Sequence, residues 1–226
     1  MISTPQVFIM YEPGTFGTML SSILTQDNPK FTSDHAHDTK TPNAIEGFHK
    51  DIEYESLSNK TDNELHDFFS QINQNDPYTV HRLSSLRFSG IDFDRYFKSV
   101  YRIVLKPKKQ DLSSYAKRIV AIDGVSDESF FMKHIKDKES VPKWFIEQLA
   151  CKEMTKYFEK HIEVFDSKAK FLPTTHTYVI DPLDLFDETK LSNLLDSVGK
   201  FLGKKFKLPL GELKKSYERN RKYFTK

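Results

Sequence analysis

The chain has 226 residues, of which 38% are hydrophobic and 29% are charged, and its formal net charge at pH 7 is +2. This length and composition predict one soluble globular domain over residues 1–226. A net charge so near zero argues against nucleic-acid binding, and no stretch approaches the roughly 18 apolar residues of a membrane span. The single cysteine, Cys151, excludes an internal disulfide and fits a reducing compartment. Because the amino terminus also lacks the features of a signal peptide, we expect a cytoplasmic protein.

The segment from Gln6 to Leu24 has the pattern of a strand, a glycine-bearing turn and a helix. Apolar and aromatic residues fill Val7–Tyr11, as in a strand buried on both faces, and apolar residues recur at helical spacing after the turn. The turn EPGTFGT contains Gly14 and Gly17, which let the backbone approach a ligand closely. Such a turn directs backbone N–H groups and a helix N-terminus at a phosphate. It has no lysine, which the phosphate-loop pattern G-x-x-x-x-G-K-[ST] requires, so a phosphate cradle and a plain tight corner are both open.

Polar residues without clear periodicity dominate residues 28–76. We interpret this stretch as an irregular insertion on the substrate side, with one helix at Asp62–Ile72. His35 and His37 alternate as metal ligands do in some sites, but no tight second ligand pair follows them. The sequence therefore predicts a loop here and no metal site.

After residue 76, strand patterns alternate with helix patterns. The expected strands are Tyr78–Leu83, Val100–Leu105 and Thr175–Ile180, and the expected helices are Leu112–Ile122, Ser129–Lys138, Pro142–Glu163, Glu188–Leu202 and Leu210–Phe224. This alternation predicts a three-layer α/β fold with a mainly parallel central sheet flanked by helices. Lys106 ends the second of these strands, and Ser113 and Ser114 begin the next helix. A second strand–loop–helix unit is therefore expected beside the first.

Three separated segments resemble the sulfotransferase family. The first, YEPGTFGTMLSSIL, is similar to the family's loop for the 5′-phosphosulfate, with residues in register at Pro13, Thr15, Thr18 and Leu20. Gly14 stands where the family has a lysine, and Phe16 stands where it has a glycine.

The second segment, RIVLKPKKQDLSSY, resembles the part of the family that holds the 3′-phosphate. There an arginine ends a strand and a serine follows eight residues later, a spacing that Lys106 and Ser114 share, with Ser113 as the neighbouring candidate. The third, TYVIDPLDLFD with the helix after it, looks like the strand, turn and helix near the family's carboxyl terminus. A fourth similarity is His81, which lies on a strand before Lys106 where the family has a histidine that acts as general base.

The resemblance implies a P-loop-NTPase-like sulfotransferase architecture that binds 3′-phosphoadenosine 5′-phosphosulfate and releases 3′,5′-adenosine bisphosphate. The 5′-phosphosulfate would lie on the turn formed by Pro13, Gly14, Thr15, Phe16, Gly17 and Thr18. The 3′-phosphate would lie beside Lys106 with Ser113 or Ser114. His81 would take the proton from a hydroxyl or amine of a small-molecule or saccharide acceptor, and the reaction requires no metal.

The family's loop lysine neutralises the oxygen that bridges phosphate and sulfuryl group. Arg82, Lys106 and Lys108 are the cations on neighbouring strands that can replace it. Glu12 would repel an anion at the turn unless its carboxylate points away. Two alternatives to a sulfotransferase are a P-loop-type kinase or other nucleotide-binding protein, and an interaction module that binds a nucleotide without catalysis.

Overall fold

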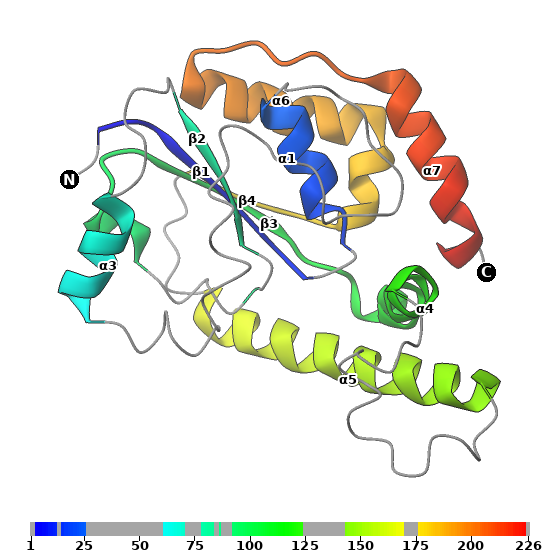
Figure 1. The fold of residues 1–226 in the computed structure, drawn as a ribbon. Helices are drawn as coiled ribbons and strands as arrows, with labels where there is room; N and C mark the ends of the chain where they lie inside the picture. The colour runs from blue at the N-terminus through cyan, green and yellow to red at the C-terminus, as the bar shows by residue number, and fades with distance from the viewer. Residues whose placement is uncertain are drawn as a thin grey trace.

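The computed structural model describes residues 3–12, 15–25, 61–70, 78–83, 86, 92–123, 143–169 and 176–224. Within them, four parallel strands form one sheet in the order β2-β1-β3-β4 (Figure 1). The strands are β1 (Gln6–Tyr11), β2 (Thr79–Leu83), β3 (Val100–Leu105) and β4 (Thr177–Ile180). Every residue of β1 and β3 is buried, as expected for the central strands of a parallel sheet with both faces covered.

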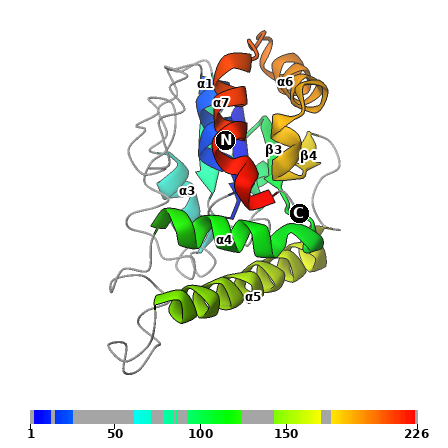
Figure 2. The same ribbon diagram turned by 90° about the vertical axis from the view of Figure 1, so that its right-hand side faces the viewer.

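Helices lie on both faces of this sheet. They are α1 (Gly17–Thr25), α3 (Asp62–Ser70), α4 (Leu112–Asp123), α5 (Lys143–Ala169), α6 (Glu188–Leu202) and α7 (Leu210–Phe224), and the short 3-10 helices are η3 (Phe93–Arg95), η4 (Lys109–Asp111) and η7 (Pro182–Phe186). The two views in Figure 1 and Figure 2 place α1, α6 and α7 on one side, with α3 and α5 on the other. Helix α4 packs against both α5 and α7. This is an α/β fold with a parallel sheet, as the alternation predicts.

Successive side chains of the strands point to opposite layers of helices. Tyr101 of β3 donates a hydrogen bond of 2.7 Å to Ser197 of α6, on the side of α1. Phe8 of β1 faces the other layer, where its ring stacks on Phe93 of η3 with a centroid distance of 4.0 Å. The face on which a strand residue lies therefore decides which helices it can contact.

The bounds of several elements confirm the sequence predictions. β3, α6 and α7 begin and end where the patterns place them. Gly203 ends α6 in the left-handed conformation, with a φ of 66°, as expected of a C-terminal glycine. Helix α5 extends beyond the predicted end at Glu163 to Ala169, and Phe165 on this added turn is buried.

Several predictions fall outside the described residues. These include the helix at Ser129–Lys138, the histidines His35 and His37, and most of residues 28–76. In the part of the chain that the structure describes, no helix combines the length and apolar character needed to cross a bilayer. The same part contains no group of three or more His, Cys, Asp or Glu side chains placed to hold a metal ion.

Candidate functional site

The carboxyl ends of the strands meet at one edge of the sheet. The register pairs Tyr11 of β1 with Leu105 of β3, and Leu105 with Ile180 of β4. The turn into α1 and the segment leading to α4 therefore begin at neighbouring positions on this edge. Parallel α/β sheets bind their ligands outside this carboxyl edge, so the candidate site lies here.

Thr15 is held by its own turn. Its backbone N–H and its hydroxyl both donate to the carbonyl of Glu12, at 3.1 Å and 2.6 Å, and its side chain is buried. The hydroxyl is thus used to close the turn in this structure. Pro13 and Gly14, the other predicted contacts of this part of the turn, lie outside the described residues.

Phe16 has the backbone conformation usually reserved for glycine. Its φ is 63°, which costs an ordinary residue about 1–2 kcal/mol. Its ring packs edge-on against Phe186 at 4.9 Å, and the guanidinium of Arg118 lies 4.4 Å from the ring centroid. These contacts hold a bulky residue in a conformation that it rarely adopts.

Gly17, the first residue of α1, lies directly under the ring of Tyr11. A Cβ added to Gly17 would come within 2.2 Å of the Tyr11 ring. Burial raises the pKa of the Tyr11 phenol, and the side chain of Thr18 acts in the opposite direction. None of the described residues accepts a hydrogen bond from the backbone N–H of Gly17 or Thr18. As far as the described residues go, the first turn of α1 therefore offers two N–H donors, together with the positive dipole end that favours an anion.

Glu12 points away from α1. Its Oε1 accepts a 2.8 Å hydrogen bond from the N–H of Leu86 and lies 2.8 Å from Nδ1 of His161 on α5. The ring of His161 in turn lies 3.9 Å from that of Tyr157. Because Tyr11 faces α1 and Glu12 faces α5, the carboxylate does not oppose an anion at the first turn of α1.

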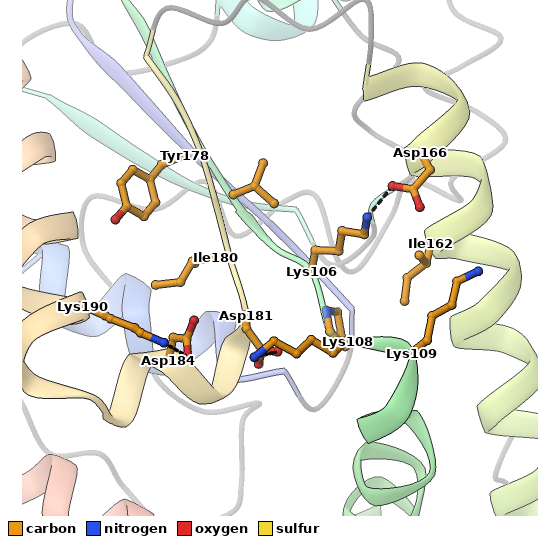
Figure 3. A pocket seen from close by; sticks show the side chains of 12 residues that line it. Lys106, Lys108, Lys109, Ile162, Asp166, Tyr178, Ile180, Asp181, Asp184 and Lys190 are labelled. Carbon is orange, nitrogen blue, oxygen red and sulfur yellow. Dashed lines mark hydrogen bonds and ion pairs between the residues drawn. The ribbon is translucent and has the colours of Figure 1, made fainter.

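A hollow of about 470 Å³ opens at the ends of β3 and β4, and we call it the lysine hollow (Figure 3). Its walls come from the segment after β3, the second half of α5, β4, and the turn into α6. The lining residues are Lys106, Pro107, Lys108, Lys109, Ile162, Asp166, Tyr178, Val179, Ile180, Asp181, Asp184 and Lys190. Four lysines thus face three aspartates, which leaves an excess of one positive charge.

Ion pairs hold three of these lysines. Lys106 pairs with Asp166 of α5, as Figure 3 shows. Lys108 lies 3.3 Å from the buried carboxylate of Asp181, and Lys190 lies 2.7 Å from Asp184. The lysine of each pair is at least partly exposed, and ion pairs that are open to solvent contribute little to stability, so an incoming phosphate can compete for these lysines.

Lys109 differs from the other three lysines, since no described residue pairs with it. Its side chain is exposed and lines the lysine hollow. The hollow therefore contains one cation whose charge is not balanced by a carboxylate of the described residues. The lysine hollow therefore suits an anion of the size of a phosphate better than it suits a metal ion.

Of the three residues predicted to contact the 3′-phosphate, one lines the lysine hollow. Lys106 lines the hollow, but Ser113 and Ser114 lie on the first turn of α4 and do not line it. Ser113 is exposed and Ser114 is half-buried. The serines therefore contribute no contact to the hollow in this structure, and their predicted phosphate contact stays a prediction.

His81 lies in the core. Its ring stacks on Phe8 with a centroid distance of 4.4 Å, its Nε2 is 2.6 Å from Oε1 of Gln6, and none of its surface is exposed. Burial lowers the pKa of this imidazole to about 3. A fully buried histidine does not reach the hydroxyl or amine of an acceptor substrate, and it binds a proton weakly. The structure therefore gives no support to a role of His81 as general base.

The sequence patterns did not indicate Asp166 or His161 as residues of this edge. Both lie on α5, far along the chain from the strands whose ends they contact, and a helical pattern does not say which strand the helix crosses. Protein-family models and curated proteins were both compared with the chain, and neither comparison finds a match.

Proposed function

We propose that the chain binds 3′-phosphoadenosine 5′-phosphosulfate at the carboxyl edge of its sheet and transfers the sulfuryl group to an acceptor hydroxyl or amine. The observation that carries the proposal is the pairing of β1 with β3, which sets two strand–turn–helix units side by side. The donor carries negative charge at two separate positions and therefore needs two adjacent anion sites. The first turn of α1 and the lysine hollow are the candidates for these sites.

In this proposal, the 5′-phosphosulfate lies at the first turn of α1, where Gly17 and Thr18 offer backbone N–H groups. The 3′-phosphate lies in the lysine hollow beside Lys106 and Lys109. The positive φ of Phe16 supports the resemblance, because Phe16 occupies the place of the family's loop glycine. The orientation of Glu12 toward α5 removes a charge that would otherwise repel the donor.

A second candidate function is nucleotide binding without transfer. The burial of His81 favours it, because a sulfotransferase of the kind proposed needs a base that reaches the acceptor. The hydrogen bonds of Thr15 to Glu12 favour it too, since they occupy a hydroxyl that would otherwise contact the transferred group. The two candidates share a ligand and differ only in the chemical step.

Calorimetric titration with 3′,5′-adenosine bisphosphate tests the shared part of the two candidates. We expect binding by the wild-type chain and about tenfold weaker binding after Lys106→Met or Lys109→Met, because each removes a charge-assisted contact to phosphate. Lys200→Met is the matched control: Lys200 is exposed on α6 outside the hollow, and its loss should leave the affinity unchanged. No binding at millimolar nucleotide, or a preference for ATP with magnesium, would contradict the proposal.

Release of 3′,5′-adenosine bisphosphate from the phosphosulfate donor then separates transfer from binding alone. Mass spectrometry of the nucleotide with a panel of phenols, alcohols, amines and saccharides should detect acceptor-dependent release. Tight donor binding with no release for any acceptor would favour the second candidate.

A further inference from the structure

Arg82 on β2 is a buried cation that has no counter-charge among the described residues. Only 7% of its surface is exposed, and its Nε has no hydrogen-bond partner. No described residue forms an ion pair with it, whereas Arg102, the other buried arginine of the sheet, pairs with Asp94. An arginine stays protonated in a protein, and an unpaired buried charge is costly. A bound anion would balance such a charge.

The position of Arg82 in the sheet directs it toward α1. Arg82 is next to Ile9 in the parallel register of β1 and β2, and it alternates with His81, whose ring stacks on Phe8 on the opposite face. Arg82 therefore shares a face with Tyr11, whose ring covers Gly17 at the start of α1.

The electrostatics of Tyr11 agree with this placement. The positive charge of Arg82 acts to lower the pKa of the Tyr11 phenol, against the larger effect of burial. Thr18 in the first turn of α1 acts on the pKa of the same phenol in the same direction. Arg82, Tyr11 and the N-terminus of α1 thus lie on the same face of the sheet.

The other two cations that could replace the missing loop lysine are already engaged. Lys106 pairs with Asp166, and Lys108 pairs with Asp181, both at the lysine hollow. Both lie beyond β3, on the far side of β1 from Arg82. Arg82 is the candidate of these three that has no carboxylate partner among the described residues.

We propose that Arg82 and the first turn of α1 form an anion site for a tetrahedral oxyanion, the 5′-phosphosulfate of the donor. This proposal rests on the proposed function for the identity of the donor, but not for the anion site itself. A guanidinium can grip two oxygens of such an anion at once, and the helix N-terminus adds N–H donors. Arg82 then supplies the positive charge that the turn EPGTFGT lacks.

A purely structural arginine would behave differently from an anion-binding one. If packing of Arg82 stabilises the fold, Arg82→Met should lower the melting temperature in buffer without sulfate or phosphate. If Arg82 instead serves to bind an anion, Arg82→Met should melt at the same temperature as the wild type or at a higher one in this buffer, because the variant has lost an unpaired buried charge. Arg82→Lys keeps the charge but not the two-point grip, and should retain part of the anion response.

Thermal melting with sodium sulfate and with sodium phosphate, at constant ionic strength set with chloride, tests the anion site. We expect both anions to stabilise the wild type and the control Arg95→Met, whose arginine is exposed and pairs with Asp62. Arg82→Met should lose this stabilisation. An equal response of Arg82→Met and wild type, or no response of the wild type, would overturn the proposal.

Calorimetry with adenosine 5′-monophosphate and adenosine 3′-monophosphate then assigns the site. Arg82→Met should weaken binding of the 5′-nucleotide about tenfold and leave the 3′-nucleotide within about twofold. Equal weakening of both would also overturn the assignment to the 5′ end. If neither nucleotide binds the wild type but the sulfate response depends on Arg82, the anion site stands and the proposed function fails.

Discussion

The imidazole of His81 is a polar group packed inside the hydrophobic core. It stacks on the ring of Phe8, at a centroid distance of 4.4 Å, and the tilted ring of Phe97 lies 6.3 Å away. Gln6 provides a polar contact to Nε2, at 2.6 Å. The protein therefore accommodates a neutral imidazole and excludes an imidazolium, which would be buried among aromatic rings. This exclusion makes the stability of the fold depend on pH.

We expect acid to destabilise the protein through His81. Burial lowers the pKa of its imidazole from the usual 6.5 to about 3 in the folded chain. Below pH 6.5, the unfolded chain binds a proton that the folded chain does not, so the free energy of unfolding falls as pH falls. The loss is about 1.4 kcal/mol per pH unit, or roughly 2 kcal/mol between about pH 7 and about pH 5. Above pH 6.5, the contribution is fully present.

Urea unfolding at these two pH values measures the effect against two variants. His81→Phe keeps a ring stacked on Phe8 but cannot bind a proton. Between these pH values, its free energy of unfolding should therefore fall by roughly 2 kcal/mol less than that of the wild type. His66→Gln changes an exposed histidine of α3 and should keep the wild-type dependence. Identical pH dependence in His81→Phe and the wild type would show that the folded chain does accept the proton.

The turn between β1 and α1 is built on a close contact. Gly17 lies under the ring of Tyr11, so that a Cβ at this position would come within 2.2 Å of the ring. Phe16, in its left-handed conformation, turns its ring toward Phe186 of η7. The glycine is thus needed for packing between strand and helix, whether or not an anion binds above it.

We expect Gly17→Ala to destabilise the protein by roughly 1–3 kcal/mol, because the added methyl would lie 2.2 Å from a buried ring that has little room to move. The gain in helix propensity, about 1 kcal/mol, does not offset this clash. Gly211→Ala is the matched control: a Cβ at Gly211 on α7 meets no atom within 4 Å, so this change should be neutral or stabilising. Chemical denaturation measures the stability of both variants. Equal stabilities of Gly17→Ala and Gly211→Ala would contradict the close contact between Gly17 and Tyr11.

Local sequence patterns predict the helices and strands of this chain, but they do not predict the contacts between these elements. The apolar run of β3 and the helical periodicity of α6 specify their structure within a few neighbouring residues, so their bounds follow from the sequence. The placement of Lys106 at a sheet edge followed in the same way. The burial of His81 did not, because alternation assigns a residue to a face without saying what covers that face. The partner of Lys106, Asp166, depends on how α5 crosses the sheet, which no local pattern contains.

At the scale of the whole molecule, α5 is fixed to the sheet at the edge where the candidate site lies. Glu12 and His161 are 149 positions apart in the sequence, yet both are almost fully buried and in contact. The next turn of α5 carries Asp166, which pairs with Lys106 in the lysine hollow. The Glu12–His161 contact therefore holds one wall of the hollow in place while turning the carboxylate from the first turn of α1.

A double-mutant cycle on this pair tests whether it anchors α5. Glu12→Met should destabilise the fold by roughly 3 kcal/mol, because it leaves His161 and the N–H of Leu86 without their buried acceptor. His161→Phe preserves the ring next to Tyr157 and removes only the polar contact. The two changes should be non-additive by about 1–3 kcal/mol in urea unfolding.

The same cycle links stability to the candidate site, because α5 forms one wall of the lysine hollow. Each single variant should therefore weaken binding of 3′,5′-adenosine bisphosphate as well as unfold more easily, whereas Glu163→Gln on the exposed side of α5 should do neither. Additivity within about 0.5 kcal/mol would mean that Glu12 and His161 act independently. In that case α5 would be held to the sheet by its apolar face, at Phe158, Ile162 and Phe165, rather than by the buried polar contact.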